Sequence, residues 1–209
     1  MNTFTIITGS GRCGTSAMMQ FFIASQKYQI KDTVYFPNMR AGYENHIYAE
    51  ANALISSEVM FPHLIHNNLE EGIKHIKYAT HNNIIGKSPA FFFYNKYEIW
   101  KEHCSKDNIQ VILLKRSNPD HVIESAKLTG ASKDWATFTD GNQIEEHYLK
   151  NISNLERNGI NYVVIEFPRF IKDLNYLYSL LSKLNIDLTL EEVISAGLKT
   201  FDPKKLNFI

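Results

Sequence analysis

The sequence predicts an α/β fold: a doubly wound, mostly parallel sheet of five strands with helices on both faces. Short β-branched or apolar runs alternate with segments of helical periodicity, which is typical of repeated strand–helix–strand units. The run at residues 111–114 is apolar throughout, as expected for a parallel strand that is covered on both faces. A glycine-rich segment and a cationic segment each follow a strand-like run, where ligands of doubly wound sheets bind.

Each element is predicted from its own local pattern. Strands are expected at residues 3–8, 33–36, 83–86, 109–114 and 162–167. Helices are expected at residues 16–25, 44–59, 69–78, 96–104, 119–128 and 143–158, and the chain from residue 172 to Phe201 reads as helical. The chain of 209 residues has no internal repeat, low-complexity tract or linker, so residues 1–209 are expected to form a single domain.

Charge and cysteine content exclude several classes of protein. The 22 basic residues balance the 22 acidic ones, so no net field would recruit nucleic acid or an anionic membrane. Two cysteines are too few for a disulfide framework or a zinc site and fit a reducing compartment. No apolar run approaches the ~18 residues of a membrane span. We therefore expect a soluble cytoplasmic protein that needs no metal, with its oligomeric state left open.

A glycine-rich segment, Gly9-Ser10-Gly11-Arg12-Cys13-Gly14-Thr15-Ser16, directly follows the first predicted strand. Glycines in such a turn let backbone N–H groups approach an anion, and the helix that follows adds its partial positive charge. The segment fits the pattern G-x(4)-G-K-[ST] except that Thr15 stands where the lysine would be. It therefore predicts a phosphate-binding turn whose cation is Arg12, the alternative being a glycine-rich turn without a ligand.

A cationic segment follows the fourth predicted strand. It reads Lys115-Arg116-Ser117-Asn118-Pro119 and continues to a serine at position 125. Asn118 is a good N-cap, and Pro119 suits the first turn of the helix expected there. Cations at the strand end and a hydroxyl on the helix could clamp one further phosphate, unless the cations merely cap the sheet.

Both segments resemble motifs of the sulfotransferases that use 3′-phosphoadenosine-5′-phosphosulfate (PAPS). The pattern [KR]-x-G-T-[ST], here Arg12 to Ser16, resembles their 5′-phosphosulfate loop on the P-loop fold. Arg116 and Ser125 resemble their 3′-phosphate motif, although the usual arginine-to-proline spacing is one residue shorter than the spacing from Arg116 to Pro119. Either Arg116 reaches across a one-residue bulge, or Lys115 shares its task.

Three weaker matches indicate a bacterial and phage branch of these sulfotransferases. They are Gly42-Tyr43-Glu44 before a helix, Ile85-Gly86-Lys87-Ser88-Pro89 as the third strand ending in a K-[DS]-P turn, and the ending Phe201-Asp202-Pro203-x-x-Leu206. The late R-K-G-x-x-G-D-W signature of the cytosolic animal enzymes is missing, which argues against that branch alone. The resemblance thus runs in the right order over nearly the whole chain.

The resemblance implies a set of site residues and an activity, sulfuryl transfer from PAPS to a hydroxyl or amine of a small-molecule or carbohydrate acceptor. The cofactor-binding residues would be Gly11, Arg12, Cys13, Gly14, Thr15, Ser16, Arg116 and Ser125. Arg12 and Lys87 would be catalytic cations, and Glu44 the general base, with His46 and Glu50 as the next candidates. The alternative role for Glu44 is a helix-start carboxylate that interacts with the helix dipole.

Other interpretations remain open at this point. A P-loop kinase or hydrolase would need a Mg²⁺-holding acid at a strand end, and Glu166 is a weak candidate. A non-catalytic nucleotide-binding module is also compatible with the sequence. A thiol at a helix start has a lowered pKa, yet a Cys13 nucleophile would need an arginine where Met19 stands. Aromatic residues could line an acceptor cleft or belong to the core: Tyr35, Phe36, Tyr43, Phe91, Phe92, Phe93 and Tyr94.

Overall fold

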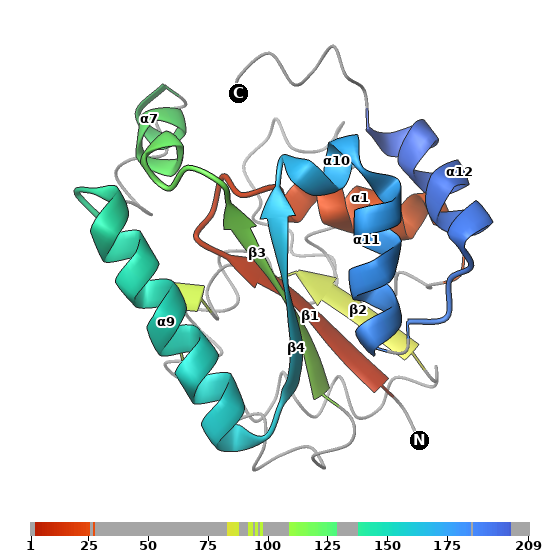
Figure 1. The fold of residues 1–209 in the computed structure, drawn as a ribbon, viewed down its shortest axis with the longest axis horizontal. Helices are drawn as coiled ribbons and strands as arrows, with labels where there is room; N and C mark the ends of the chain where they lie inside the picture. Colours follow the sequence, from red (N-terminus) through yellow and green to blue (C-terminus); the bar gives the residue numbers. More distant parts are fainter. Residues whose placement is uncertain are drawn as a thin grey trace, which may run out of the picture.

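A parallel sheet forms the centre of the molecule. The computed structural model describes residues 3–25, 27, 83–87, 92–93, 95, 97, 109–128, 138–184 and 186–201. The described strands are β1 (Thr3–Gly9), β2 (Asn83–Lys87), β3 (Ile109–Arg116) and β4 (Asn161–Phe167). They pair in parallel in the order β2-β1-β3-β4 (Figure 1). The expected α/β class and parallel sheet are confirmed, while the strand expected at residues 33–36 lies outside the described residues.

Seven described helical elements flank the sheet. They are α1 (Thr15–Ser25), α7 (Asp120–Leu128), α9 (Gly141–Asn158), α10 (Arg169–Lys172), α11 (Leu174–Leu181), the 3-10 turn η3 (Ser182–Leu184) and α12 (Leu190–Thr200). The helices expected at residues 16–25, 119–128 and 143–158 are confirmed to within two residues at their starts. Those expected at residues 44–59 and 69–78, and most of residues 96–104, lie outside the described residues.

The C-terminal helical segment differs from the single stretch expected from residue 172. It begins earlier, at Arg169, and divides into four elements because N-cap residues within it start new helices. The Asp173 side chain accepts a hydrogen bond from the N–H of Tyr176 at 2.9 Å and starts α11. Thr189 and Glu192 form a reciprocal capping box that starts α12.

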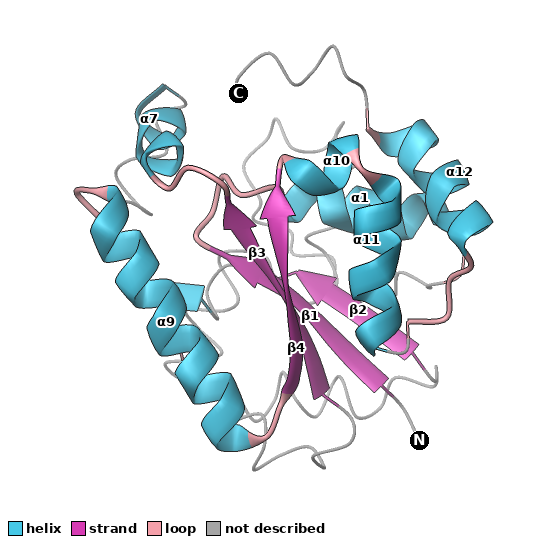
Figure 2. Cartoon of the chain, viewed as in Figure 1, coloured by secondary structure: helices cyan, strands magenta, loops and turns pink. Residues whose placement is uncertain are grey.

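Helices cover both faces of the sheet, as the sequence predicts. Side chains alternate along β3, so Val111 and Leu113 pack with α9, whereas Ile112 and Leu114 pack with α1, α11 and α12. Figure 2 shows α9 on one side of the strands and the C-terminal helices on the other. Because both faces are covered, β3 can be apolar from residue 111 to residue 114 without exposing that surface.

The strand order creates a switch point between β1 and β3. The strand β1 pairs with β2 on one side and with β3 on the other. Along the chain, the strand order therefore runs in one direction from β1 to β2 and in the opposite direction from β2 to β3 and β4. Gly9, the last residue of β1, lies beside Leu114 of β3, and Ile7 lies beside Lys87 of β2. Ligands of doubly wound sheets bind in the crevice at such a point, outside the carboxyl ends of the strands. The glycine-rich loop and the end of β3 therefore meet where a ligand is expected.

Candidate functional site

The loop after β1 has a backbone that favours glycine at two of its turns. Gly11 and Gly14 have φ values of +73° and +89°, and Arg12, between them, has a φ of +51°. A side chain at Gly11 would meet no described atom within 4 Å, so this part of the loop is open. The exposed Arg12 is held in a conformation that non-glycine residues rarely adopt. The loop therefore presents an open backbone turn beside an exposed cation.

Close packing, rather than backbone conformation alone, requires glycine at positions 9 and 14. A Cβ on Gly9 would lie 2.4 Å from the carbonyl oxygen of Leu114. A Cβ on Gly14 would lie 2.5 Å from the ring of Phe167 at the end of β4. The two neighbouring segments thus press directly against the loop and fix its path.

Helix α1 begins directly after the loop. The N–H of Met18 donates to the Gly14 carbonyl oxygen at 2.9 Å, which closes the first turn. The start of a helix carries a partial positive charge and attracts anions. Thr15 is buried and Ser16 half-buried at this helix start. The position that holds lysine in the G-x(4)-G-K-[ST] pattern is thus occupied by a small, nearly enclosed hydroxyl.

Arg116 is a buried cation that reaches the loop from β3. Its exposed fraction is 4%, and it is the one charged side chain buried among the described residues. Its Nη1 donates to the carbonyl oxygen of Arg12 at 3.0 Å, and its guanidinium lies 5.5 Å from the Phe167 ring centroid. Burial, followed by the positive charge of Arg12, lowers the pKa of Arg116. A guanidinium keeps its charge nonetheless, so a positive centre stays enclosed beside the loop.

Lys115 points away from the loop, although it precedes Arg116 directly. The strand β3 continues through Arg116, two residues beyond its expected end, so successive side chains fall on opposite faces. Lys115 Nζ pairs with Glu145 of α9 at 2.7 Å and lies 5.9 Å from the Tyr148 ring centroid. Of the two cations at this strand end, Arg116 is therefore the one in contact with the loop.

Helix α7 brings Ser125 to the loop. Arg12 Nε donates to Ser125 Oγ at 3.1 Å. Asn118 caps the helix as expected, since its Oδ1 accepts from the N–H of Asp120 at 3.0 Å. Val122 and Ala126 form the buried side of α7 and hold it against the sheet. Arg12, Arg116 and Ser125, which are far apart in the sequence, thus form a connected group.

The thiol of Cys13 belongs to the core. Its exposed fraction is 0%, and it packs with residues of α1 and the C-terminal helices. Burial raises the pKa of Cys13 to about 11. The lowered pKa expected for a thiol at a helix start is therefore wrong here, because desolvation outweighs the hydrogen bonds that lower the pKa. Any contact of Cys13 with an anion would involve its backbone.

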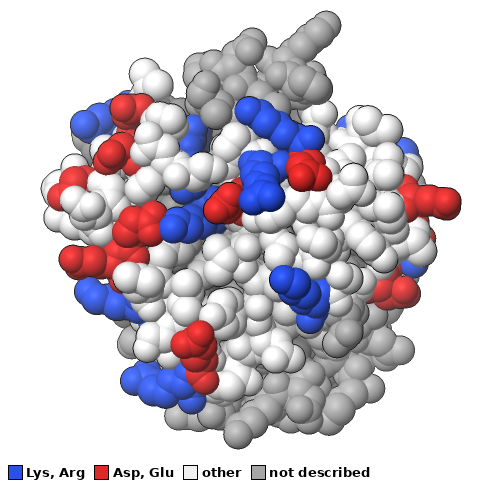
Figure 3. Space-filling view, in the orientation of Figure 1, with Lys and Arg blue, Asp and Glu red and all other residues white. Residues whose placement is uncertain are grey.

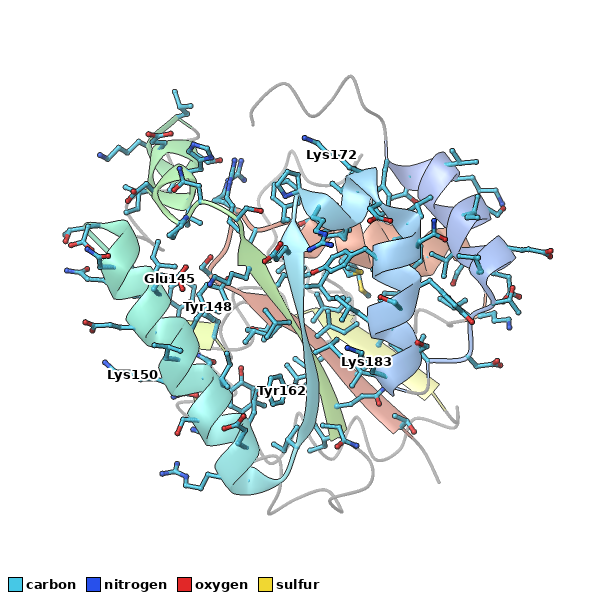
Figure 4. All side chains as sticks on the ribbon, in the orientation of Figure 1. Glu145, Tyr148, Lys150, Tyr162, Lys172 and Lys183 are labelled. Atoms are coloured by element: carbon cyan, nitrogen blue, oxygen red, sulfur yellow. The ribbon has the colours of Figure 1, made fainter. Side chains whose placement is uncertain are left out.

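Tyr148 is a loop contact that the sequence does not predict. It lies on α9, and Figure 4 shows it on the side of the helix toward the sheet. Its hydroxyl accepts from the N–H of Ser10 at 3.3 Å and donates to the Leu114 carbonyl oxygen. Burial raises its pKa well above the ordinary value, so the phenol stays protonated. The spacing of Ile144 and Tyr148 marks a buried helix face, but it does not identify the loop as its neighbour.

Several predicted site residues lie outside the described part of the chain. These are Glu44, His46 and Glu50, and among the aromatic candidates Tyr35, Phe36, Tyr43, Phe91 and Tyr94. Lys87 ends β2 beside β1, and its backbone alone is described. Phe92 is fully buried and packs with Tyr148, so it is a core residue rather than part of a cleft lining. Phe93 is half-buried against the same core.

Comparison with solved structures finds similar folds. The sulfotransferase domain of the olefin synthase from Synechococcus PCC 7002 aligns with a TM-score of 0.58 and 18% identity. The alignment covers 99% of this chain and 82% of that domain. The fold is sulfotransferase-like. A retinol dehydratase, solved with androsterone and the inactive cofactor PAP, aligns with a TM-score of 0.45 and 11% identity over 96% of this chain and 65% of its own. No protein-family model matches the sequence, and comparison with curated proteins finds no similar sequence.

Charged groups on one face of the molecule are mixed rather than gathered by sign. Figure 3 shows cations and carboxylates interspersed on the viewed face. The Oε2 atom of Glu166, on β4, lies 3.8 Å from Nη1 of Arg169. The strand β3, which neighbours β1, ends in the two cations Lys115 and Arg116. Among the described residues there is no group of three metal-ligating side chains and no helix that meets the length and hydropathy of a membrane span.

Proposed function

We propose that this chain is a PAPS-dependent sulfotransferase that transfers a sulfuryl group to a hydroxyl or amine. The acceptor would be a small molecule or a carbohydrate, and the product adenosine 3′,5′-bisphosphate (PAP) would be released. The observation that carries the proposal is the hydrogen bond from buried Arg116 to the carbonyl oxygen of Arg12. It joins two cation-bearing segments at the switch point, where one nucleotide would have to bridge them.

The residues present fit a nucleotide with two separate phosphate groups. Around Gly11 the loop is open, and a 5′-phosphosulfate bound there would lie near the positive start of α1. Arg116 and the Ser125 hydroxyl would bind the 3′-phosphate. The charge of Arg12 already lowers the pKa of Arg116, so these two like charges oppose each other. A bound anion would relieve that repulsion, which favours a doubly anionic ligand over a neutral one.

The proposed roles follow from what the reaction requires. When bound, PAPS supplies the sulfuryl group. Arg12 and Lys87 would stabilise the negative charge that develops on the departing phosphate oxygen as its bond to sulfur breaks and the acceptor's bond to sulfur forms. Glu44 would accept the proton of the acceptor. The residues that would hold the cofactor are Gly11, Arg12, Cys13 through its backbone, Gly14, Thr15, Ser16, Arg116 and Ser125.

Two other functions make different demands on the same site. A P-loop kinase uses a loop lysine and a Mg²⁺-holding acid, whereas this chain has Thr15 in the loop and Lys115-Arg116 at the end of β3. A non-catalytic nucleotide-binding module would use the same cradle without a general base. Preference for PAP or for Mg²⁺-ATP distinguishes the proposed sulfotransferase from a kinase. Turnover of an acceptor distinguishes it from a binding module.

Titration calorimetry with PAP, beside ATP with Mg²⁺, tests the proposal. We expect metal-independent binding of PAP that Arg116→Ala weakens at least tenfold, because a charge-assisted contact is lost. Lys115→Ala is the matched control: it removes a neighbouring cation that faces α9, and PAP affinity should stay within about twofold. Preference for Mg²⁺-ATP would indicate a kinase. Loss of transfer in Glu44→Gln with PAP binding intact would support catalysis over a binding module.

A further inference from the structure

We infer that Tyr148 is a positioning residue that fixes the phosphate-binding conformation of the loop by holding Ser10 against β3. The proposed function supplies the identity of the anion, a 5′-phosphate group, so the inference rests on it in that respect. The role is distinct from cofactor contact, because the Tyr148 side chain is buried beneath the loop with an exposed fraction of 2%.

One phenol oxygen joins three segments of the chain. The Tyr148 hydroxyl donates to the carbonyl oxygen of Leu114 and accepts from the N–H of Ser10 at 3.3 Å. It also lies 3.3 Å from Ser10 Oγ, across 138 positions of sequence. The Ser10 hydroxyl in turn donates to the Gly11 carbonyl oxygen at 3.2 Å. Tyr148 thus contacts Ser10 directly, and the Ser10 hydroxyl links it to Gly11, where the loop leaves the sheet.

This anchoring matters because of the backbone that follows. Gly11 and Arg12 both have positive φ, and Arg12 has no intrinsic preference for that conformation. Such a turn persists only when surrounding contacts hold it. With the N–H of Ser10 directed to Tyr148, the chain continues into the positive-φ pair Gly11 and Arg12, and Gly11 is the open part of the loop. Without this anchor, part of the binding free energy would be spent on ordering the loop.

Other contacts hold α9 in place independently of the Tyr148 hydroxyl. Lys115 pairs with Glu145 one turn earlier on the helix, and the N–H of Gly141 donates to Asp120 Oδ1 at 2.8 Å. The Tyr148 ring also packs against Phe92 at a centroid distance of 4.5 Å. Replacement of Tyr148 by phenylalanine therefore removes the hydrogen bonds while leaving the ring and the helix supported.

The test compares Tyr148→Phe with Tyr97→Phe. Tyr97 is a second fully buried phenol in the same core, and its hydroxyl donates to Asn151 Oδ1 at 2.8 Å rather than to the loop. Calorimetry would measure affinities for PAP, adenosine 5′-phosphate and adenosine 3′-phosphate. We expect both variants to be less stable than the wild type. Tyr148→Phe alone should weaken PAP and adenosine 5′-phosphate about tenfold, with adenosine 3′-phosphate unchanged.

Amide hydrogen exchange at Ser10 gives a readout that needs no ligand. Exchange should be faster in Tyr148→Phe and unchanged in Tyr97→Phe. The inference is wrong if Ser10 exchange is unaltered, or if it quickens while 5′-phosphate affinity stays at the wild-type value. A wild-type protein that binds no PAP would instead refute the proposed function. Ser10 exchange would then decide the positioning role by itself, with unaltered exchange in Tyr148→Phe refuting it and faster exchange supporting it.

Discussion

Arg12 Nε donates a hydrogen bond to Ser125 Oγ at 3.1 Å, although 113 positions separate the two residues in the sequence. Through this bond the side chain of a loop residue is directed toward α7. The carbonyl oxygen of the same arginine accepts from Arg116 at 3.0 Å. Arg12 is thereby fixed at both its backbone and its guanidinium, and the cation keeps a defined position at the carboxyl edge of the sheet.

Replacement of Ser125 by alanine should weaken PAP binding by about 3- to 10-fold. The change removes a proposed phosphate ligand and frees the Arg12 side chain, at the cost of one hydrogen bond. Calorimetric titration measures the effect. The control is Ser179→Ala on α11, whose hydroxyl donates to the Tyr176 carbonyl oxygen in its own helix. Equal affinities for the two variants would exclude Ser125 from the site.

Gly14→Ala should abolish measurable PAP binding and destabilise the fold by about 2–4 kcal/mol. The added methyl group meets the Phe167 ring at 2.5 Å, at a φ of +89° that alanine avoids. Gly159→Ala is a matched control, because Gly159 also has positive φ but open space around its Cβ position. It should cost about 1 kcal/mol in chemical denaturation and leave PAP affinity unchanged. Normal binding by Gly14→Ala would contradict the packing argument.

Stability should fall as pH rises above about 9. Burial raises the pKa of Cys13 from 9.0 to about 11, so between these values the unfolded chain releases a proton that the folded chain retains. Unfolding is then favoured as pH rises, by about 1.4 kcal/mol at pH 10 from this thiol. The raised pKa of Tyr148 acts in the same direction at still higher pH. Urea titrations from pH 7.5 to 10.5 measure the slope, which should be shallower in Cys13→Ala.

Phe167→Leu should weaken PAP binding about 3- to 10-fold. The ring packs against Gly14 and lies below the Arg116 guanidinium, so leucine removes a support for the buried cation. Phe138→Leu, a half-buried phenylalanine on the opposite face of the sheet, serves as the control. It should lower the free energy of unfolding by a similar amount of about 1 kcal/mol without changing affinity. A weaker PAP affinity in both variants would point to a general loss of packing.

Local patterns predicted the elements that local chemistry determines. Adjacent residues predict the strand that ends at Gly9, the Asn118 cap and the helix α9, and the structure confirms all three. Contacts between segments that are far apart in the sequence could not be predicted from such local patterns. The contact between Tyr148 and Ser10 depends on how α9 lies on the sheet, and no spacing within either segment encodes it.

The pKa of Cys13 shows why a local rule can have the wrong sign. The position at a helix start predicts a lowered value, but burial on all sides dominates, and burial depends on the tertiary fold. The face of β3 on which Arg116 lies could be predicted in part from the sequence. Once β3 extends to residue 116, alternation along the strand places Lys115 and Arg116 on opposite faces. A two-residue difference in the strand end therefore decides which cation meets the loop.

The order in which the chain is made has a consequence for the loop. Residues 9–15 leave the ribosome well before the groups that contact them, which are Leu114, Tyr148, Phe167 and Phe170. A nascent chain that ends at α7 would contain every glycine of the loop but lack Tyr148 and both phenylalanines. The proposed nucleotide binding would reach its full affinity only after synthesis has passed α10, so it would report that the C-terminal half has packed against the loop.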